Sequence, residues 1–124
     1  MVMNRKRFQL ANTYDVVQSR QYAREMARDM GFSLSDQARI ATAVSEVLQQ
    51  LVSSSGGGEV FFTPLADGER RGMECTCTGG PILAQLVNSV SSRLPGGIAR
   101  LMDEFILEHG DGEEMAVVMR KWLA

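Results

Sequence analysis

The sequence lacks the features that mark several broad classes of protein. No apolar run approaches the roughly 20 residues that a membrane-spanning helix needs, and the first residues contain no secretory hydrophobic segment. Neither sign of charge dominates, because 13 basic and 15 acidic residues leave a formal net charge of −2. A nucleic-acid-binding domain would carry a basic excess. We therefore expect a cytoplasmic protein that binds neither membrane nor nucleic acid.

Residues for metal and disulfide chemistry are also scarce. The chain has two cysteines, Cys75 and Cys77, and one histidine, His109, whereas a structural zinc site takes four ligands. Two residues apart on a strand, the cysteines would point to the same face, and a disulfide between such close partners would be strained. We expect reduced, partly buried thiols, with a redox site as the alternative. His109 is expected in a solvated turn.

Length and hydrophobicity predict a single domain. With 124 residues, of which 44% are hydrophobic, the chain can form one core, and we assign residues 1–124 to one domain. The eight methionines are expected to fill the core. An adaptable binding surface is the alternative for these flexible side chains.

The first part of the chain predicts a strand and a helix. Residues 5–10 mix apolar and basic side chains as a short strand does. Asp15 and Gln18 have the spacing of a capping box, which predicts that the helix begins at Asp15, and Gly31 fits a left-handed C-terminal cap. Apolar residues at helical spacing predict the buried face: Val16, Ala23, Met26, Ala27 and Met30.

A second helix follows directly. Ser33 and Asp36 predict its start in the same way, and the serine–glycine run at residues 53–58 predicts its end. Residues at helical spacing predict its apolar face: Leu34, Ala38, Ala41, Val44, Leu48 and Leu51.

The second half predicts a hairpin, two helices and two closing strands. Strands at residues 59–63 and 71–78 are joined by a loop at 64–70, in which Asp67-Gly68 is a turn dipeptide. Residues 82–90 have helical periodicity, and residues 95–97 open a last helix whose Ile98, Leu101 and Met102 face inward. Strands at 105–107 and 115–122 complete an α+β two-layer sandwich. Its mostly antiparallel sheet has helices on one face and leaves the other face for water or a partner.

The second helix carries a polar ridge formed by Thr42, Glu46, Gln50 and Ser53. A carboxylate at Glu46 would serve as a general base for an attacking hydroxyl. An amide oxygen at Gln50, one turn later, would ligate a Mg²⁺ that bridges phosphates. The alternative is the ordinary solvated face of an amphipathic helix, since Glu and Gln are good helix formers.

Most of the chain resembles the RsbT/RsbW-type serine kinases of the GHKL ATPase superfamily. The resemblance implies a Bergerat ATPase-like fold that binds ATP and Mg²⁺, and it gives Glu46 the place of the catalytic base and Gln50 the place of a metal-binding Asn. It is carried, in one consistent order, by four stretches: DVVQSRQ at 15–21, GFSLSDQARI at 31–40 followed by Ser45-Glu46, LPGGIARLMDEF at 94–105, and KWL at 121–123.

Three departures from this family concern the nucleotide. Gln50 keeps the amide but displaces its oxygen by about one bond length. The family's Asp-x-Gly-x-Gly box, whose Asp accepts from the adenine amino group, is replaced by residues 77–82, with no acid between Glu74 and Asp103. A carboxylate–adenine bond contributes about 1.5–3 kcal/mol. The glycine-rich lid is short, which leaves three glycines as nucleotide contacts: Gly80, Gly96 and Gly97.

These departures lead to three hypotheses. In the first, the chain is a degenerate kinase without a bound cofactor that binds a STAS-domain antagonist, a sigma factor or a phosphatase regulator. Arg20, Arg24 and Arg28, at i, i+4 and i+8, would then meet an acidic partner, although a solvated helix face is the alternative. In the second hypothesis, the chain is an active serine kinase with ATP and Mg²⁺. In the third, it is a structural subunit that forms a homodimer or a complex.

Overall fold

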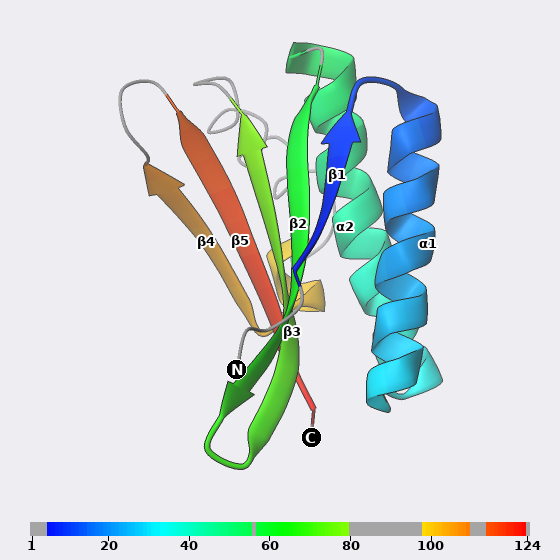
Figure 1. The fold of residues 1–124 in the computed structure, drawn as a ribbon, viewed down its shortest axis with the longest axis vertical. Helices are drawn as coiled ribbons and strands as arrows, with labels where there is room; N and C mark the ends of the chain where they lie inside the picture. The colour runs from blue at the N-terminus through cyan, green and yellow to red at the C-terminus, as the bar shows by residue number, and fades with distance from the viewer. Residues whose placement is uncertain (1–4, 56, 80–97, 110–113, 124) are drawn as a thin grey trace.

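The computed structural model describes residues 5–55, 57–79, 98–109 and 114–123, which form a five-stranded sheet and two long helices (Figure 1). The strand order is β1-β2-β3-β5-β4, and every neighbouring pair is antiparallel. In chain order the elements are β1 (Lys6–Leu10), α1 (Thr13–Met30), α2 (Leu34–Ser55), β2 (Gly58–Asp67), β3 (Arg70–Gly79), η1 (Ile98–Leu101), β4 (Glu104–His109) and β5 (Met115–Trp122).

The two long helices cover one face of the sheet, as Figure 1 shows. Buried side chains of both helices and the inward-facing side chains of the strands form one hydrophobic core. Toward the β1 edge of the sheet the rings of Phe8, Tyr22 and Phe62 meet, with centroids 5.3 Å apart for Tyr22 and Phe62 and 5.5 Å apart for Phe8 and Tyr22. The predicted α+β two-layer sandwich with helices on one face is confirmed.

The start of α1 differs from the prediction. Asn12, not Asp15, is the N-cap, and Asp15 is the reciprocal acid of the capping box. The Asp15 amide donates to Asn12 Oδ1 at 3.1 Å, while Asp15 Oδ2 accepts from the amide of Ala11 at 2.8 Å. The helix therefore begins at Thr13, because Asn12 is as good a cap as Asp15 and lies three residues earlier. The predicted cap at Gly31 is confirmed by its left-handed φ of 97°.

The buried face of α2 differs from the predicted one only in the first part of the helix, since Ala41, Val44, Leu48 and Leu51 are buried as predicted. Ser33 caps the helix as expected, since its Oγ accepts from the Asp36 amide at 3.1 Å. Leu34, however, is 75% exposed, and Ala38 is exposed as well. The inward position in this first turn belongs to Gln37, whose Nε2 donates to the Phe32 carbonyl at 2.9 Å. The remaining buried positions follow: Ile40, Ala41, Ala43, Val44, Val47, Leu48 and Leu51.

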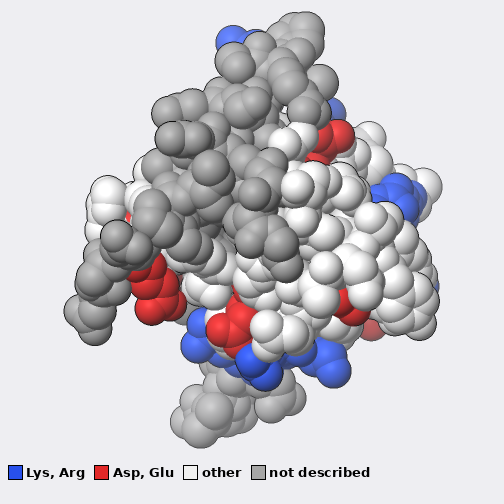
Figure 2. Space-filling view, turned by 90° about the horizontal axis from the view of Figure 1, so that it is seen from above, with Lys and Arg blue, Asp and Glu red and all other residues white. Residues whose placement is uncertain are grey.

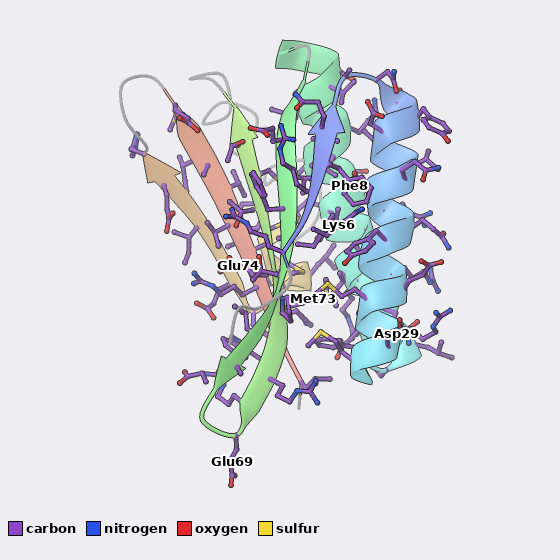
Figure 3. All side chains as sticks on the ribbon, in the orientation of Figure 1. Lys6, Phe8, Asp29, Glu69, Met73 and Glu74 are labelled. Atoms are coloured by element: carbon purple, nitrogen blue, oxygen red, sulfur yellow. The ribbon has the colours of Figure 1, made fainter. Side chains whose placement is uncertain are left out.

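The predicted hairpin is present, but its strands are longer than expected. The strands continue to Asp67 and from Arg70, so the loop has two residues rather than seven. Gly68 opens it with φ 64°, as a two-residue turn with glycine first requires. Pro64 lies inside β2, where it costs little because the pairing of β2 with β1 already ends at Phe62. The hairpin projects past the rest of the sheet, and Glu69 lies at its tip (Figure 3).

The predicted last helix is a single 3₁₀ turn, η1. Ile98 and Met102 are buried as expected and Leu101 is half-buried. In the described residues η1 ends at Leu101, and β4 begins at Glu104. The predicted helix at 82–90 and the glycines Gly80, Gly96 and Gly97 lie outside the described residues. His109, expected in a turn, is the exposed last residue of β4.

Cys75 and Cys77 lie in the core beneath the helices. Both are free thiols, and their Sγ atoms are 3.9 Å apart. Their exposed fractions are 1% and 0%, so they are buried more deeply than predicted. Burial raises the pKa of the Cys75 thiol well above its ordinary value, and the neighbouring Cys77 adds to the rise. A thiol held in its neutral form is a poor nucleophile, so Cys75 behaves here as a small apolar side chain.

Candidate functional site

Glu46 and Gln50, the two residues predicted to carry nucleotide chemistry, lie one turn apart on α2. Both side chains are half-buried, and Thr42 and Ser53 on the same ridge are exposed. A carboxylate there can accept a proton, and an amide oxygen can ligate a cation. In the part of the chain that the structure describes, no group of three or more His, Cys, Asp or Glu side chains is placed to hold a metal ion.

The predicted site lies between α2, which carries Glu46 and Gln50, and the carboxyl end of β3. Cys77 lies where the resemblance places the adenine-binding acid, and its side chain is fully buried. Its neighbours across the sheet are Val60 on β2 and Val117 on β5. These three residues share the face that α1 and α2 cover, so the described part of the β3 side of the site is apolar.

Leu51 of α2 lies against Gly58 of β2 and against Gly79 of β3, two residues beyond Cys77. A methyl group built on Gly79 would lie 3.1 Å from Leu51 Cδ1, and one built on Gly58 would lie 3.0 Å from Leu51 Cδ2. Leu51 itself is fully buried. Its side chain therefore packs against the start of β2 and the end of β3.

The end of the molecule where α2 and β3 finish is largely uncharged in its described part. Figure 2 shows this end, with acidic and basic side chains lying mainly toward the rim. Gly80, Gly96 and Gly97, the predicted phosphate and nucleotide contacts, belong to the part that is not described. The structure thus brings together the α2 and β3 walls of the predicted site and leaves the predicted glycine contacts untested.

Arg20, Arg24 and Arg28 of α1 gather on one side of the helix, as their spacing predicts. Together with Gln21, Glu25, Leu34 and Gln37 they line a hollow of about 440 Å³. Arg28 contacts Asp29 at 3.2 Å, and both side chains are largely exposed. Among the described residues, neither Arg20 nor Arg24 forms an ion pair. The hollow therefore presents guanidinium groups to whatever approaches α1 from this side.

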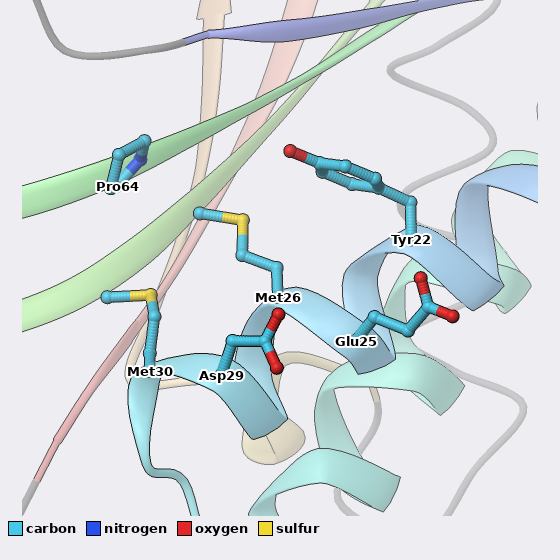
Figure 4. A pocket seen from close by; sticks show the side chains of 6 residues that line it. All are labelled: Tyr22, Glu25, Met26, Asp29, Met30 and Pro64. Carbon is cyan, nitrogen blue, oxygen red and sulfur yellow. The ribbon is translucent and has the colours of Figure 1, made fainter.

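A second hollow, of about 300 Å³, lies between α1 and β2 (Figure 4). Met26 and Met30 were predicted to be core residues, but both are half-buried and line this hollow. Pro64 forms the opposite wall, and Tyr22 contributes its ring. Helical spacing did not predict the half-burial of the two methionines, because it depends on the register of β1, whose first residue Lys6 lies opposite Phe62 and not Pro64.

The open face of the sheet carries a polar network that sequence reasoning missed. Arg120 donates from Nε to Glu74 at 2.8 Å and from a terminal nitrogen to Glu104 at 3.2 Å. Trp122 Nε1 donates to the other oxygen of Glu104 at 2.7 Å, and Arg70 lies 4.0 Å from the centroid of the Trp122 ring. The Trp122 hydrogen bond, assisted by Arg120, holds the pKa of Glu104 below its ordinary value of 4.5.

Lys121 is a buried lysine that joins three elements. Its Nζ donates to the Leu101 carbonyl of η1 at 3.1 Å and lies 3.7 Å from Asp103 and 3.8 Å from Asp36 of α2. Alternation along β5 places this position on the core side, together with Met119. An inward-facing lysine was therefore readable from the sequence, although its partners were not.

No family model matches this chain, but it is similar to a curated protein and to a solved structure. The serine/threonine-protein kinase RsbT of Bacillus subtilis (strain 168) is 32% identical over 120 residues, covering 89% of this chain and 90% of that protein. A chain of the SiaB–SiaC complex from Pseudomonas aeruginosa has a TM-score of 0.57 at 10% identity, covering 95% of this chain and 89% of that chain. The second likeness concerns the fold alone. No helix in the described ranges is long and apolar enough to cross a membrane.

Proposed function

The chain belongs to the RsbT family of serine/threonine-protein kinases, and we propose that it is a cytoplasmic regulator of a bacterial partner-switching pathway that acts by binding a protein. Its partner is a STAS-domain antagonist; a sigma factor or a phosphatase regulator are the other partner classes that the family resemblance suggests. The structural neighbour was solved as the SiaB–SiaC complex, which supports a protein partner. In this proposal the chain binds its partner without transferring phosphate.

The observation that carries the proposal is the burial of Cys77. At this position the family resemblance calls for an acid that accepts from the adenine amino group. Cys77 is fully buried beside Cys75 and Val60, and a thiol is only a weak hydrogen-bond acceptor. Loss of a charge-assisted bond of about 1.5–3 kcal/mol corresponds to one to two decades of affinity for the nucleotide.

Two further residues of α2 support the same conclusion. Leu51 packs against Gly58 and against Gly79, two residues beyond Cys77, and in this proposal its side chain fills space that a bound purine ring would need. Gln50 stands where the family carries a metal-binding Asn. Its extra methylene displaces the amide oxygen by about 1.5 Å, whereas ligand distances in metal sites vary by about 0.2 Å. Both the base-binding and the metal-binding contacts of a family kinase are therefore altered.

The partner surface in this proposal includes Arg20, Arg24 and Arg28. Arginine suits a carboxylate-bearing partner because its planar guanidinium group forms paired hydrogen bonds. All three line one hollow between α1 and the first turn of α2. Arg20 and Arg24 form no ion pair with another described residue. Positive side chains without a partner of their own are available to steer an acidic protein onto this surface.

The proposal is tested with the STAS-domain proteins encoded in the same genome. Each is titrated against the full chain without nucleotide, and again with Mg²⁺ and ATP labelled on its terminal phosphate. We expect one of them to bind equally well in both conditions without becoming labelled. An Arg20→Glu/Arg24→Glu variant should weaken binding at least about tenfold, while the control Arg100→Glu, at an exposed position of η1, should not.

An active kinase is the second candidate function, and the retention of Glu46 favours it. This carboxylate stands at the position of the family's catalytic base and is half-buried on α2. In that case ATP and Mg²⁺ are the cofactors, and label passes to a serine or threonine of the STAS-domain protein. Transfer that Glu46→Ala abolishes would establish the kinase and overturn the non-catalytic proposal.

A further inference from the structure

The solvent side of α1 carries a regular row of five residues: Tyr14, Val17, Gln21, Arg24 and Arg28. Their spacing of three, four, three and four residues keeps them on one stripe of the helix. Tyr14 and Val17 are 68% and 55% exposed, Gln21 and Arg28 are exposed, and Arg24 is half-exposed. This outer row is apolar in its first half and basic in its second half.

Exposed apolar side chains are concentrated here. The described residues include four exposed large hydrophobic residues, and two of them, Tyr14 and Val17, belong to the outer row. A third, Leu34 of α2, borders the row, because it lines the same hollow as Arg24 and Arg28. The fourth, Ile106, lies on β4, beyond the two strands β3 and β5. Single exposed hydrophobic residues need no explanation, but a group of them beside charged residues marks an interaction surface.

The charged residues around the outer row are distributed unevenly between its two flanks. Arg20 lies on the flank toward α2 and lines the hollow that contains Leu34 and Gln37. Asp29 lies toward the opposite flank, since it lines the hollow that contains Pro64 of β2, and Glu25 borders both hollows. Glu25 accepts from Gln21 at 3.1 Å, and Asp29 contacts Arg28 at 3.2 Å across exposed side chains. The hollow on the α2 side of the row therefore contains three arginines and one glutamate, which makes this side basic on balance.

We propose that the outer row is a docking seam for one amphipathic helix of a protein partner, which deepens and rests on the partner binding proposed above. Spacings of three and four residues are those of a helix that packs along another helix. From Tyr14 to Arg28 the row extends about 21 Å, at 1.5 Å per residue, which accommodates about four turns of a partner helix. The partner helix carries apolar residues at the end that meets Tyr14 and Val17, and carboxylates at the end that meets Arg24 and Arg28.

The seam also specifies orientation. An apolar half and a basic half allow only one direction of the partner helix to match both ends, because the reversed helix would place carboxylates over Val17 and apolar residues over Arg24. Mismatched ends leave charges unpaired and apolar surface exposed, and such penalties give an interface its specificity. The amide of Gln21, in the middle, is compatible with either half.

A designed peptide probes this seam directly. The probe is a fluorescent, end-blocked helical peptide of the same length as α1, 18 residues, with leucines at the seam spacing in one half and glutamates in the other. Its binding to the full chain is followed by fluorescence anisotropy. We expect Tyr14→Ser/Val17→Ser and Arg24→Glu/Arg28→Glu each to weaken binding about tenfold or more. A peptide with lysines in place of the glutamates should restore binding to the Arg24→Glu/Arg28→Glu variant.

The controls are matched in chemistry and differ in place. Ile106→Ser removes the exposed hydrophobic residue of β4, and Arg100→Glu reverses an exposed charge on η1; neither should change peptide affinity. Circular dichroism verifies that each variant is folded. The proposal is overturned by the absence of saturable binding up to about 1 mM peptide, by equal binding to wild type and seam variants, or by seam-dependent binding to phosphatidylserine vesicles instead of the peptide. The assay contains neither nucleotide nor STAS-domain protein, so failure of the seam can be distinguished from failure of the proposed function, which the STAS-domain titration tests.

Discussion

Replacing Cys77 by aspartate restores an acid at the position of the family's adenine-binding carboxylate, and we expect it to destabilise the folded protein strongly. Cys77 is fully buried, and its cross-strand neighbours Val60 and Val117 carry no donor that could bond a carboxylate. An uncompensated buried charge costs about 3–5 kcal/mol, a large part of the roughly 5–15 kcal/mol that stabilises a domain of this kind.

The cost should depend on pH in a definite direction. Burial raises the pKa of an introduced carboxyl group in the folded state above its unfolded value of about 3.9. The neutral form is then favoured in the folded protein, so the deficit is largest above the folded-state pKa and disappears as the pH falls toward the unfolded value. Between these two limits its slope approaches about 1.4 kcal/mol per pH unit.

Urea unfolding at several pH values measures this effect by linear extrapolation. Cys77→Val is the matched control, since it keeps the side chain apolar and of similar size and should change the free energy of unfolding by less than about 1.5 kcal/mol. If Cys77→Asp were as stable as Cys77→Val at neutral pH, the position would open onto a hydrated cavity. That result would show that the hydrophobic core does not close the nucleotide site at Cys77.

Three further substitutions test other parts of the structure. Leu51→Ala removes a fully buried side chain and should lower the free energy of unfolding in urea by about 2–5 kcal/mol; a loss below about 1 kcal/mol would be incompatible with its packing against Gly58 and Gly79. Gly72→Ala places a methyl group 2.4 Å from the Lys121 carbonyl oxygen and should cost about 1–3 kcal/mol, which a melting curve identical to wild type would contradict. The pKa of Glu104 is lowered by Trp122 and Arg120, so its stabilising contribution is present above the ordinary pKa of 4.5 and lost as the pH falls through the lower folded-state value. Melting temperatures of Glu104→Gln and wild type should therefore differ at pH 7 and converge at low pH, and a constant difference would disprove this coupling.

Local periodicity predicted most of the elements because each depends on neighbouring residues. The hairpin, the closing strand at 115–122 and the left-handed cap at Gly31 were all readable from alternation and turn residues. The buried position in the first turn of α2 was not predictable from such patterns, because the polar Gln37 occupies it. That residue is satisfied by a hydrogen bond to Phe32, which no hydrophobic pattern contains. The loop of the hairpin was overestimated because Pro64 was taken to end a strand.

Contacts between distant segments account for the remaining differences. Arg120 and Glu74 are 46 residues apart in sequence, so their ion pair follows from the register of β5 against β3. Lys121 was predictable as an inward residue, but its acceptor on η1 depends on a 3₁₀ turn where a longer helix was expected. Two residues of the outer row of α1, Arg24 and Arg28, were predicted as part of an arginine surface. The exposure of Tyr14 and Leu34 was not predictable, because it depends on the packing of α1 against α2.

The candidate site shows the same division. Helical spacing placed Glu46 and Gln50 together on α2, and strand alternation placed Cys75 and Cys77 on a common face. The proximity of Leu51 to the ends of β2 and β3 was not predictable, since it depends on how α2 lies across the sheet. Because of that contact, an apolar side chain fills the space at the ends of β2 and β3, close in sequence to the departures at Gln50 and Cys77.

Titration calorimetry with ATP and with ADP, in the presence and absence of Mg²⁺, decides whether the chain has lost nucleotide binding. The full chain is titrated to millimolar nucleotide, and its melting temperature is recorded under the same conditions. A nucleotide at about 100 times its Kd would raise the free energy of unfolding by about 2.7 kcal/mol. We expect neither nucleotide to give saturable heat or to raise the melting temperature. Saturable, Mg²⁺-dependent binding that raises the melting temperature would contradict this expectation and favour the active kinase.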